Sequence, residues 1–166
     1  ARRVESMIHF VSRKAMNIEG LAEKQIELFV NLGFLNNFAD IYKLADKEKE
    51  ILNLEGYQEK SVKKLLQSIE NSKQNSLEKL LFGLGIRHIG EKTARELAMN
   101  FNTIENLLSQ EYNNILSKAD FGEVKVTSLI HWIDNKDNQE IIKRLIASGV
   151  NTSYIGDQVV ESKLTG

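Results

Sequence analysis

Residues 88–92 read His-Ile-Gly-Glu-Lys, and a pattern like it occurs at three other places in the chain. In every copy an apolar residue stands second and a Glu stands fourth, and three of the copies carry Lys at the fifth position. Successive copies begin 36, 32 and 32 residues apart. Repetition at this spacing is typical of one supersecondary unit used several times. The other copies are Gly20-Leu21-Ala22-Glu23-Lys24, Gly56-Tyr57-Gln58-Glu59-Lys60 and Asp120-Phe121-Gly122-Glu123-Val124.

Each copy lies between two stretches with helical character. Gly in such a turn supplies backbone angles and a close approach that a side chain hinders. Glu in a first helical turn suits the positive end of the helix dipole, and the residues that follow keep an amphipathic helical spacing. We therefore predict an all-α fold of four tandem helix–hairpin–helix motifs, packed as two pseudo-symmetric pairs. The apolar faces are Ile26, Phe29 and Val30; Val62, Leu65, Leu66 and Ile69; Ala94, Leu97 and Phe101; and Val126, Leu129, Ile130 and Ile133.

A hairpin of this kind is suited to binding a phosphate group. The first amides of a helix have no partner within it, and a turn containing Gly lets an anion approach them. Such contacts grip the nucleic-acid backbone and do not read bases. Lys24, Lys60 and Lys92 would add positive charge beside the phosphate. A single turn is explained as well by a helix C-cap and a solvated lysine, but four aligned turns with a shared Glu favour contact with DNA.

The copies depart from an ideal Gly-apolar-Gly turn in two ways. Copies one and two keep the first Gly and place Ala22 and Gln58 at the third position. Copies three and four keep the third Gly, and copy four begins with an acidic Asp120. Copy four also has Val124 where the others have Lys, so it would bind through Lys125 or serve a structural purpose.

Copy three has the most basic setting, with Arg87, Lys92 and Arg95 near Gly90, and we expect it to bind most strongly. Tyr57 lies at a turn tip, where packing and contact with a sugar or base edge are both open. No residue is assigned a catalytic or metal-binding role. The candidate DNA-binding residues are Gly20, Leu21, Ala22, Lys24, Gly56, Tyr57, Gln58, Lys60, Arg87, His88, Ile89, Gly90, Lys92, Thr93, Gly122 and Lys125.

Composition limits the alternatives. The 166 residues include no Cys, and the three His residues are too scattered to suggest a metal site. No apolar run approaches the length of a membrane span and no signal-like start is present, so we expect a soluble, cytoplasmic protein without a membrane partner. The net charge of −1 argues against nucleic-acid binding, because most DNA-binding domains are basic. The positive charges are unevenly placed, however, and gather at residues 2–14 and 60–64.

The chain divides into four parts by pattern. Residues 1–16 are predicted to form a leading helix, and residues 17–72 the first hairpin pair. Residues 73–150 hold the second pair and a last helix over about 139–148, which Gly149 caps. At the boundary, Asn75 or Ser76 is expected to cap the next helix. The helical pattern stops at residue 151, so residues 151–166 are expected to form a linker.

Four stretches carry a resemblance to a known family. They are HFVSRKAMNIEGL at 9–21, LEGYQEKS at 54–61, NSLEKLLFGLGIRHIGEKTA at 75–94 and LIASGVN at 145–151. Together they closely resemble the helix–hairpin–helix domain of bacterial NAD-dependent DNA ligases, and the resemblance covers nearly the whole chain. In that family the domain follows a four-Cys zinc finger and precedes a BRCT domain. The resemblance thus implies that both modules are missing from this fragment.

The resemblance also implies a function. The family joins nicked DNA during replication and repair, using a Lys adenylated by NAD in a Lys-x-Asp-Gly motif that this chain lacks. NAD, Mg and Zn are therefore expected in other domains of the parent enzyme, with no cofactor in this fragment. What carries over to the hairpins is sequence-independent binding to the minor-groove side of double-stranded nicked DNA. The implied partners are this DNA and the other domains of the same ligase chain.

Two alternatives stay open at this point. The chain could be the DNA-binding domain of another helix–hairpin–helix repair protein, such as a junction-binding or nuclease accessory domain. It could also be a helical protein-interaction module with no DNA role, a hypothesis that the net charge of −1 favours. A Cys-x-x-Cys finger upstream would support the ligase hypothesis over the first alternative, and duplex binding would exclude the second.

Overall fold

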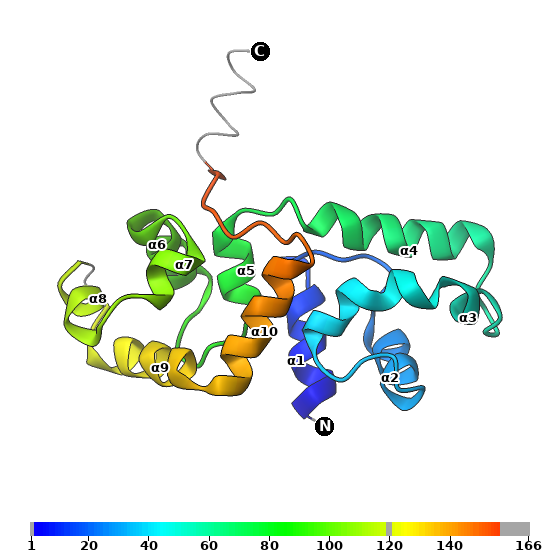
Figure 1. Cartoon of the computed structure of the whole chain (residues 1–166), viewed down its shortest axis with the longest axis horizontal. Helices are drawn as coiled ribbons and strands as arrows, with labels where there is room; N and C mark the ends of the chain where they lie inside the picture. Colours follow the sequence, from blue (N-terminus) through cyan, green and yellow to red (C-terminus); the bar gives the residue numbers. More distant parts are fainter. Residues whose placement is uncertain (1, 119–120, 157–166) are drawn as a thin grey trace, which may run out of the picture.

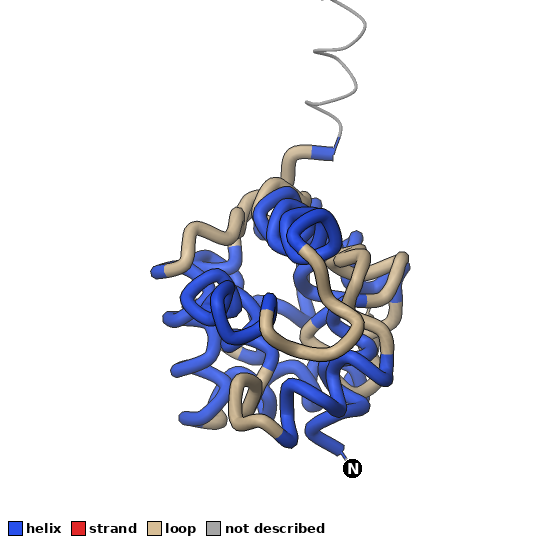
Figure 2. The backbone as a smooth tube through the Cα atoms, turned by 90° about the vertical axis from the view of Figure 1, so that its right-hand side faces the viewer, coloured by secondary structure: helices blue, strands red, loops and turns tan. Residues whose placement is uncertain are grey.

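The structure is a computed structural model that describes residues 2–118 and 121–156 (Figure 1). Over these residues it is built from helices and contains no strand, only one isolated antiparallel bridge between Thr103 and Ser153 (Figure 2). The predicted all-α class is confirmed. The elements are α1 (Arg2–Val11), α2 (Glu23–Asn31), the 3-10 helix η1 (Phe38–Lys47), α3 (Glu48–Leu52), α4 (Glu59–Ser72), α5 (Leu77–Gly83), α6 (Glu91–Phe101), α7 (Ile104–Leu108), α8 (Tyr112–Lys118), α9 (Glu123–Asp134) and α10 (Lys136–Ala147).

Four helices begin at the repeated Glu, as the sequence predicts. They are α2, α4, α6 and α9, whose first residues are Glu23, Glu59, Glu91 and Glu123. Each packs against the helix that precedes its turn, namely α1, α3, α5 and α8. The carboxylates thus lie at the positive ends of four helix dipoles, where they stabilise the first turns. In Figure 1, α2, α3 and α4 lie on one side and α6, α7, α8 and α9 on the other, with α1, α5 and α10 between them.

One apolar core runs through the molecule, and the faces of these four helices supply much of it. Three of the predicted face residues, Val30, Leu66 and Ile130, are half-buried and pack against the core from its edge. The rest are buried, because they occur every three or four residues and so lie on one side of each helix. The buried face residues are Ile26, Phe29, Val62, Leu65, Ile69, Ala94, Leu97, Phe101, Val126, Leu129 and Ile133.

The bounds of the first and last helices differ from those that the sequence predicts. The leading helix ends at Val11, and residues 12–16 form turns in which Ala15 and Met16 are buried. The last helix begins at Lys136, three residues earlier than expected, because the Asn135 side chain accepts a hydrogen bond from the Asn138 amide and caps it. Gly149, with φ +91°, ends this helix as predicted.

Residues 151–156 are a strap bound to the domain and do not form the expected linker. The Asn151 amide donates to the Lys73 carbonyl at 2.9 Å, and the Leu77 amide donates to the Ser153 carbonyl at 3.0 Å. The Ser76 hydroxyl accepts from the Ile155 amide and makes no cap hydrogen bond to α5. The strap therefore holds the α4–α5 connection, where the sequence placed the boundary between hairpin pairs. Residues 157–166 of the predicted linker lie outside the described residues.

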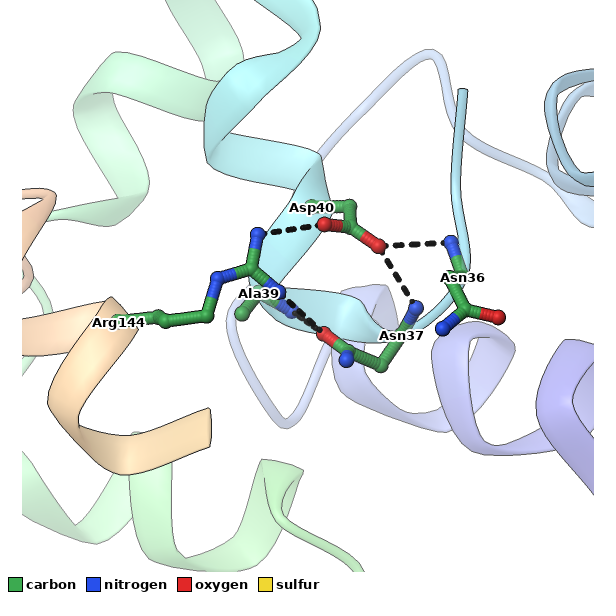
Figure 3. A network of polar contacts seen from close by, with 5 residues as sticks. All are labelled: Asn36, Asn37, Ala39, Asp40 and Arg144. Atoms are coloured by element: carbon green, nitrogen blue, oxygen red, sulfur yellow. Dashed lines mark hydrogen bonds and ion pairs between the residues drawn. The ribbon is translucent and has the colours of Figure 1, made fainter. Parts of the chain in front are cut away.

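A polar network joins α10 to η1 (Figure 3). Arg144 pairs with Asp40 at 2.5 Å, and Asp40 also accepts from the amides of Asn36 and Asn37 at 2.7 and 3.0 Å. Burial alone would raise the pKa of Asp40. The Arg144 guanidinium and the two amides outweigh burial, so the pKa of Asp40 lies below its ordinary value of 3.8. Because α10 also packs on α9, this contact connects one side of the molecule to the other.

Candidate nucleic-acid interface

The first three repeated turns share one backbone conformation at their first aligned position. We call residues 19–22, 55–58, 87–90 and 119–122 turns one to four. Gly20 and Gly56 have φ of +92° and +89°, and His88 has φ +69°. Turn three therefore adopts the left-handed conformation although it carries a side chain there. Asp120, the corresponding residue of turn four, lies outside the described residues.

The third aligned position does not require Gly in the first three turns. Ala22, Gln58 and Gly90 all have ordinary backbone angles there, with φ of −84°, −136° and −85°. A Cβ added to Gly90 would meet no atom within 4 Å. The missing second Gly of turns one and two thus leaves their backbone unchanged. Gly122 is different, since its φ is +80°.

The helices that follow the turns begin with amides left open to solvent ligands. No side chain caps α2, α6 or α9. In turn two the Gln58 amide donates to the Ser61 hydroxyl at 2.9 Å, so one donor there is occupied. Of the helices that do not follow a repeated turn, η1, α7 and α10 are capped by the side chains of an Asn, a Thr and an Asn, whereas α3 and α5 have no side-chain cap. Uncapped amides at the positive end of a helix are suited to binding an anion.

The apolar residue of turns one, three and four is a buried anchor, whereas Tyr57 of turn two is partly exposed and lines the first-pair hollow described below. Leu21, Ile89 and Phe121 are 2%, 5% and 6% exposed. Tyr57 is half-buried and stacks on Phe29 with ring centroids 6.0 Å apart. Its hydroxyl is buried without a hydrogen-bond partner, and burial raises its pKa. Leu21 and Ile89 can therefore offer only backbone groups to a ligand.

Turns one and two border a common hollow of about 560 Å³, which we call the first-pair hollow. Gly20 and Gly56 lie on its wall, and its charged lining residues are Lys24 and Lys64 together with Glu19 and Glu55. Lys60, one turn into α4, is exposed but does not line the hollow. Lys64 was not among the predicted site residues, although it falls one helical turn after Lys60 and so was within reach of the pattern.

Turn three is surrounded by cations from three parts of the chain. The Lys14 ammonium lies 3.8 Å from a carboxylate oxygen of Glu91. Lys14, Lys79, Lys92 and Arg95 line one hollow of about 330 Å³, the third-turn hollow, together with Glu78, Phe82 and Glu91. Sequence reasoning missed Lys14 and Lys79 as site residues. Only the packing of α1 against α5 brings the segment after α1 to this turn.

Two predicted contacts of the second pair are engaged within the protein. Thr93 is 4% exposed, and its hydroxyl accepts a hydrogen bond from the Lys125 ammonium at 2.9 Å. This bond joins α6 to α9, so the Thr93 hydroxyl is buried against Lys125, and the Lys125 ammonium uses one of its three donors within the protein. Among the described residues of turn four and the start of α9, Val124 is 63% exposed where the other copies have Lys. Turn four thus offers uncapped amides beside one lysine, Lys125, which is also bound to Thr93.

Comparison with known proteins places this arrangement in a family. The helix-hairpin-helix motif family matches residues 79–142. A DNA ligase of Halalkalibacterium halodurans is 45% identical over 156 residues, and one of Mycoplasma capricolum is 42% identical over 156 residues; each alignment covers 94% of this chain and 23% of the ligase. The chain corresponds to one segment of a bacterial DNA ligase. A Bacillus cereus DNA ligase is 42% identical over 157 residues, and this alignment covers 95% of the chain and 23% of the ligase.

This ligase segment thus spans less than a quarter of the length of the curated relatives it matches. In residues 2–118 and 121–156, no three His, Cys, Asp or Glu side chains come together in a way that could hold a metal ion. None of the described helices is both long and apolar enough to cross a membrane.

Proposed function

We propose that this ligase segment binds double-stranded DNA by its phosphate backbone, without sequence preference. The observation that carries the proposal is the set of uncapped helix amides at the repeated turns, each presented by a buried apolar anchor. Phosphates carry no base information, so contacts of this kind position a protein on a duplex without specifying sequence. The similarity to DNA ligases supports DNA as the partner.

Charge placement supports the same proposal despite a net charge of −1. The third-turn hollow is lined by four cations against two carboxylates, whereas in the first-pair hollow Lys24 and Lys64 are balanced by Glu19 and Glu55, so the excess positive charge lies at turn three. A polarised surface can attract a polyanion locally while the whole domain is nearly neutral. Binding should therefore depend steeply on salt, because each neutralised phosphate releases counterions.

We further propose that the segment acts in its parent as a non-catalytic domain of an NAD-dependent DNA ligase. In this role it would hold the minor-groove side of the duplex around a nick during cytoplasmic replication and repair, beside the other domains of the same chain. NAD, Mg and Zn would be bound by those other domains. Support comes from the resemblance of the turns and their flanks and from the match to a limited part of the ligase length.

The test is binding of the chain to labelled nicked duplex, intact duplex and single-stranded DNA across a salt series. We expect duplex binding at low salt with a negative slope of log K against log salt, and no preference between unrelated sequences. Lys92→Glu should weaken binding, whereas Lys143→Glu, a matched exposed cation on α10, should change it less. No duplex binding at low salt, in a chain whose circular dichroism is helical, would refute the proposal and favour a protein-interaction module.

A further inference from the structure

A second hollow adjoins turn three, and its lining differs from that of the third-turn hollow. It has a volume of about 330 Å³ and lies between turn three, α9 and the start of α10. We call it the Trp132 hollow. Its lining residues are Arg87, His88, Thr127, Ser128, His131, Trp132, Asn135 and Asn138.

The Trp132 hollow is lined by one formal positive charge, Arg87, and by no carboxylate. None of its lining residues is acidic, although the chain contains 23 Asp and Glu residues. Within the described part of the chain, the side chains of Arg87, His88 and His131 make no hydrogen bond or ion pair. A guanidinium and two imidazoles that lack protein partners and border one hollow form a recognition surface for an anion with several oxygen acceptors.

Trp132 adds a flat apolar wall to this surface. The indole is half-buried and packs against the core on one side. The Asn138 side chain donates to the Trp132 backbone carbonyl at 3.0 Å, and the Asn135 side chain caps α10, so the α9–α10 junction beside the indole is fixed. A partly exposed aromatic face next to a guanidinium is suited to binding a nucleotide irrespective of sequence, with a sugar or base stacked beside a bound phosphate.

Turn three connects this hollow to the uncapped amides. Arg87 and His88 belong to the turn and also line the Trp132 hollow. The α6 amides begin two residues later, after Gly90. A strand whose phosphate is held by these amides is therefore adjacent to the hollow. The volume of about 330 Å³ lies at the small end of ligand sites, which suits one nucleotide unit.

We propose that the Trp132 hollow is a subsite for the DNA strand held at turn three. A neighbouring phosphate binds Arg87 and His131, and its sugar or base lies against Trp132. This inference rests on the proposed function, and it adds one face of α9 to an interface that the sequence confined to the turns and the first residues after them.

Trp132 is the sole tryptophan of the chain, so its fluorescence reports on this hollow directly. We expect nicked duplex to quench the Trp132 emission as it binds at low salt. The double variant Arg87→Ala/His131→Ala should lose most of this quenching and bind several-fold more weakly. Its salt slope should become less negative by about 1, the value for one lost phosphate contact. Both side chains are exposed and unpaired, so the variant should remain folded.

The control is Lys143→Ala, which removes an exposed cation on α10 outside the hollow and should leave quenching and salt slope unchanged. Duplex binding measured by anisotropy of labelled DNA, with no change in Trp132 emission, would overturn the subsite and leave the proposed function standing. If Arg87→Ala/His131→Ala had wild-type affinity and a wild-type salt slope, the subsite would likewise be overturned and the proposed function would stand. Absence of duplex binding by anisotropy would refute the proposed function, and the subsite would fall with it.

Discussion

A substitution at Gly90 can test phosphate binding by turn three without disturbing the backbone conformation of the turn. The φ of Gly90, −85°, is open to any residue, and a Cβ would meet no atom within 4 Å. We therefore choose Gly90→Gln, because Gln58 already occupies the corresponding position of turn two. If the α6 amides hold a phosphate, the new side chain lies between them and the DNA.

Gly90→Gln should weaken DNA binding strongly and change the free energy of unfolding little. A hydrogen bond to a charged group contributes about 1.5–3 kcal/mol, so loss of one such contact should weaken DNA binding by roughly 10- to 150-fold. For folding, Gly is favoured over residues such as Ala as an N-cap, but replacing Gly also reduces the entropy of the unfolded chain by about 0.4–1 kcal/mol. These effects oppose each other, so the free energy of unfolding should change by less than about 1 kcal/mol.

The assay is fluorescence anisotropy with nicked duplex at fixed low salt, together with urea unfolding of the same preparations. Ala22→Gln is the matched comparison, because it places the same side chain before the α2 amides, where we expect a smaller loss of affinity since turn one has less basic surroundings. Wild-type affinity of Gly90→Gln, with unchanged unfolding, would refute phosphate binding by the turn-three amides. A loss of more than about 2 kcal/mol in unfolding free energy would instead refute our account of the backbone.

The remaining predictions concern charge and the internal contacts. Lys92→Glu should weaken duplex binding at least several-fold more than Val124→Glu, because turn three has the more basic surroundings; equal losses in anisotropy titrations would contradict this ranking. Arg144→Ala should lower the free energy of unfolding by about 1–2 kcal/mol at pH 7. Since the pKa of Asp40 is depressed in the folded protein, this difference should be present above about pH 4 and shrink as the pH falls further, as urea unfolding at pH 7 and pH 3 can measure. Burial raises the pKa of Tyr42 to about 12, so folding should lose stability between pH 10 and 12, and Tyr42→Phe should lessen that loss in thermal melts.

The helix starts could be predicted from the sequence because their determinants are local. Glu in a first turn, an apolar residue before it and a spacing of three and four after it all act within one or two helical turns. Such signals place Glu91 at the start of α6 and bury Leu97 without knowledge of other elements. The last helix was placed late because its first turn is polar, and its start depends on capping by Asn135.

The site could be predicted only in part because its surroundings depend on tertiary packing. Thr93 falls on the buried side of α6, but only the approach of α9 supplies Lys125 as its partner. Lys14 reaches Glu91 from a segment 77 residues away in sequence. No local pattern encodes such neighbours, because they follow from how the hairpins stack. The strap over residues 151–156 was missed for the same reason, since it is held mainly by backbone hydrogen bonds, which leave little trace in the sequence.

The internal contacts bear on how weak phosphate sites can act together. Each turn offers few donors, and the net charge of −1 gives little general attraction for DNA. When two such sites are held in fixed positions, the second contact forms at a high effective concentration once the first has formed. Arg144 with Asp40 and the strap at Lys73 and Leu77 fix the elements between the first-pair hollow and turn three. Loosening them would lower affinity without removing any DNA contact, so the unequal turns are best understood as parts of one rigid surface.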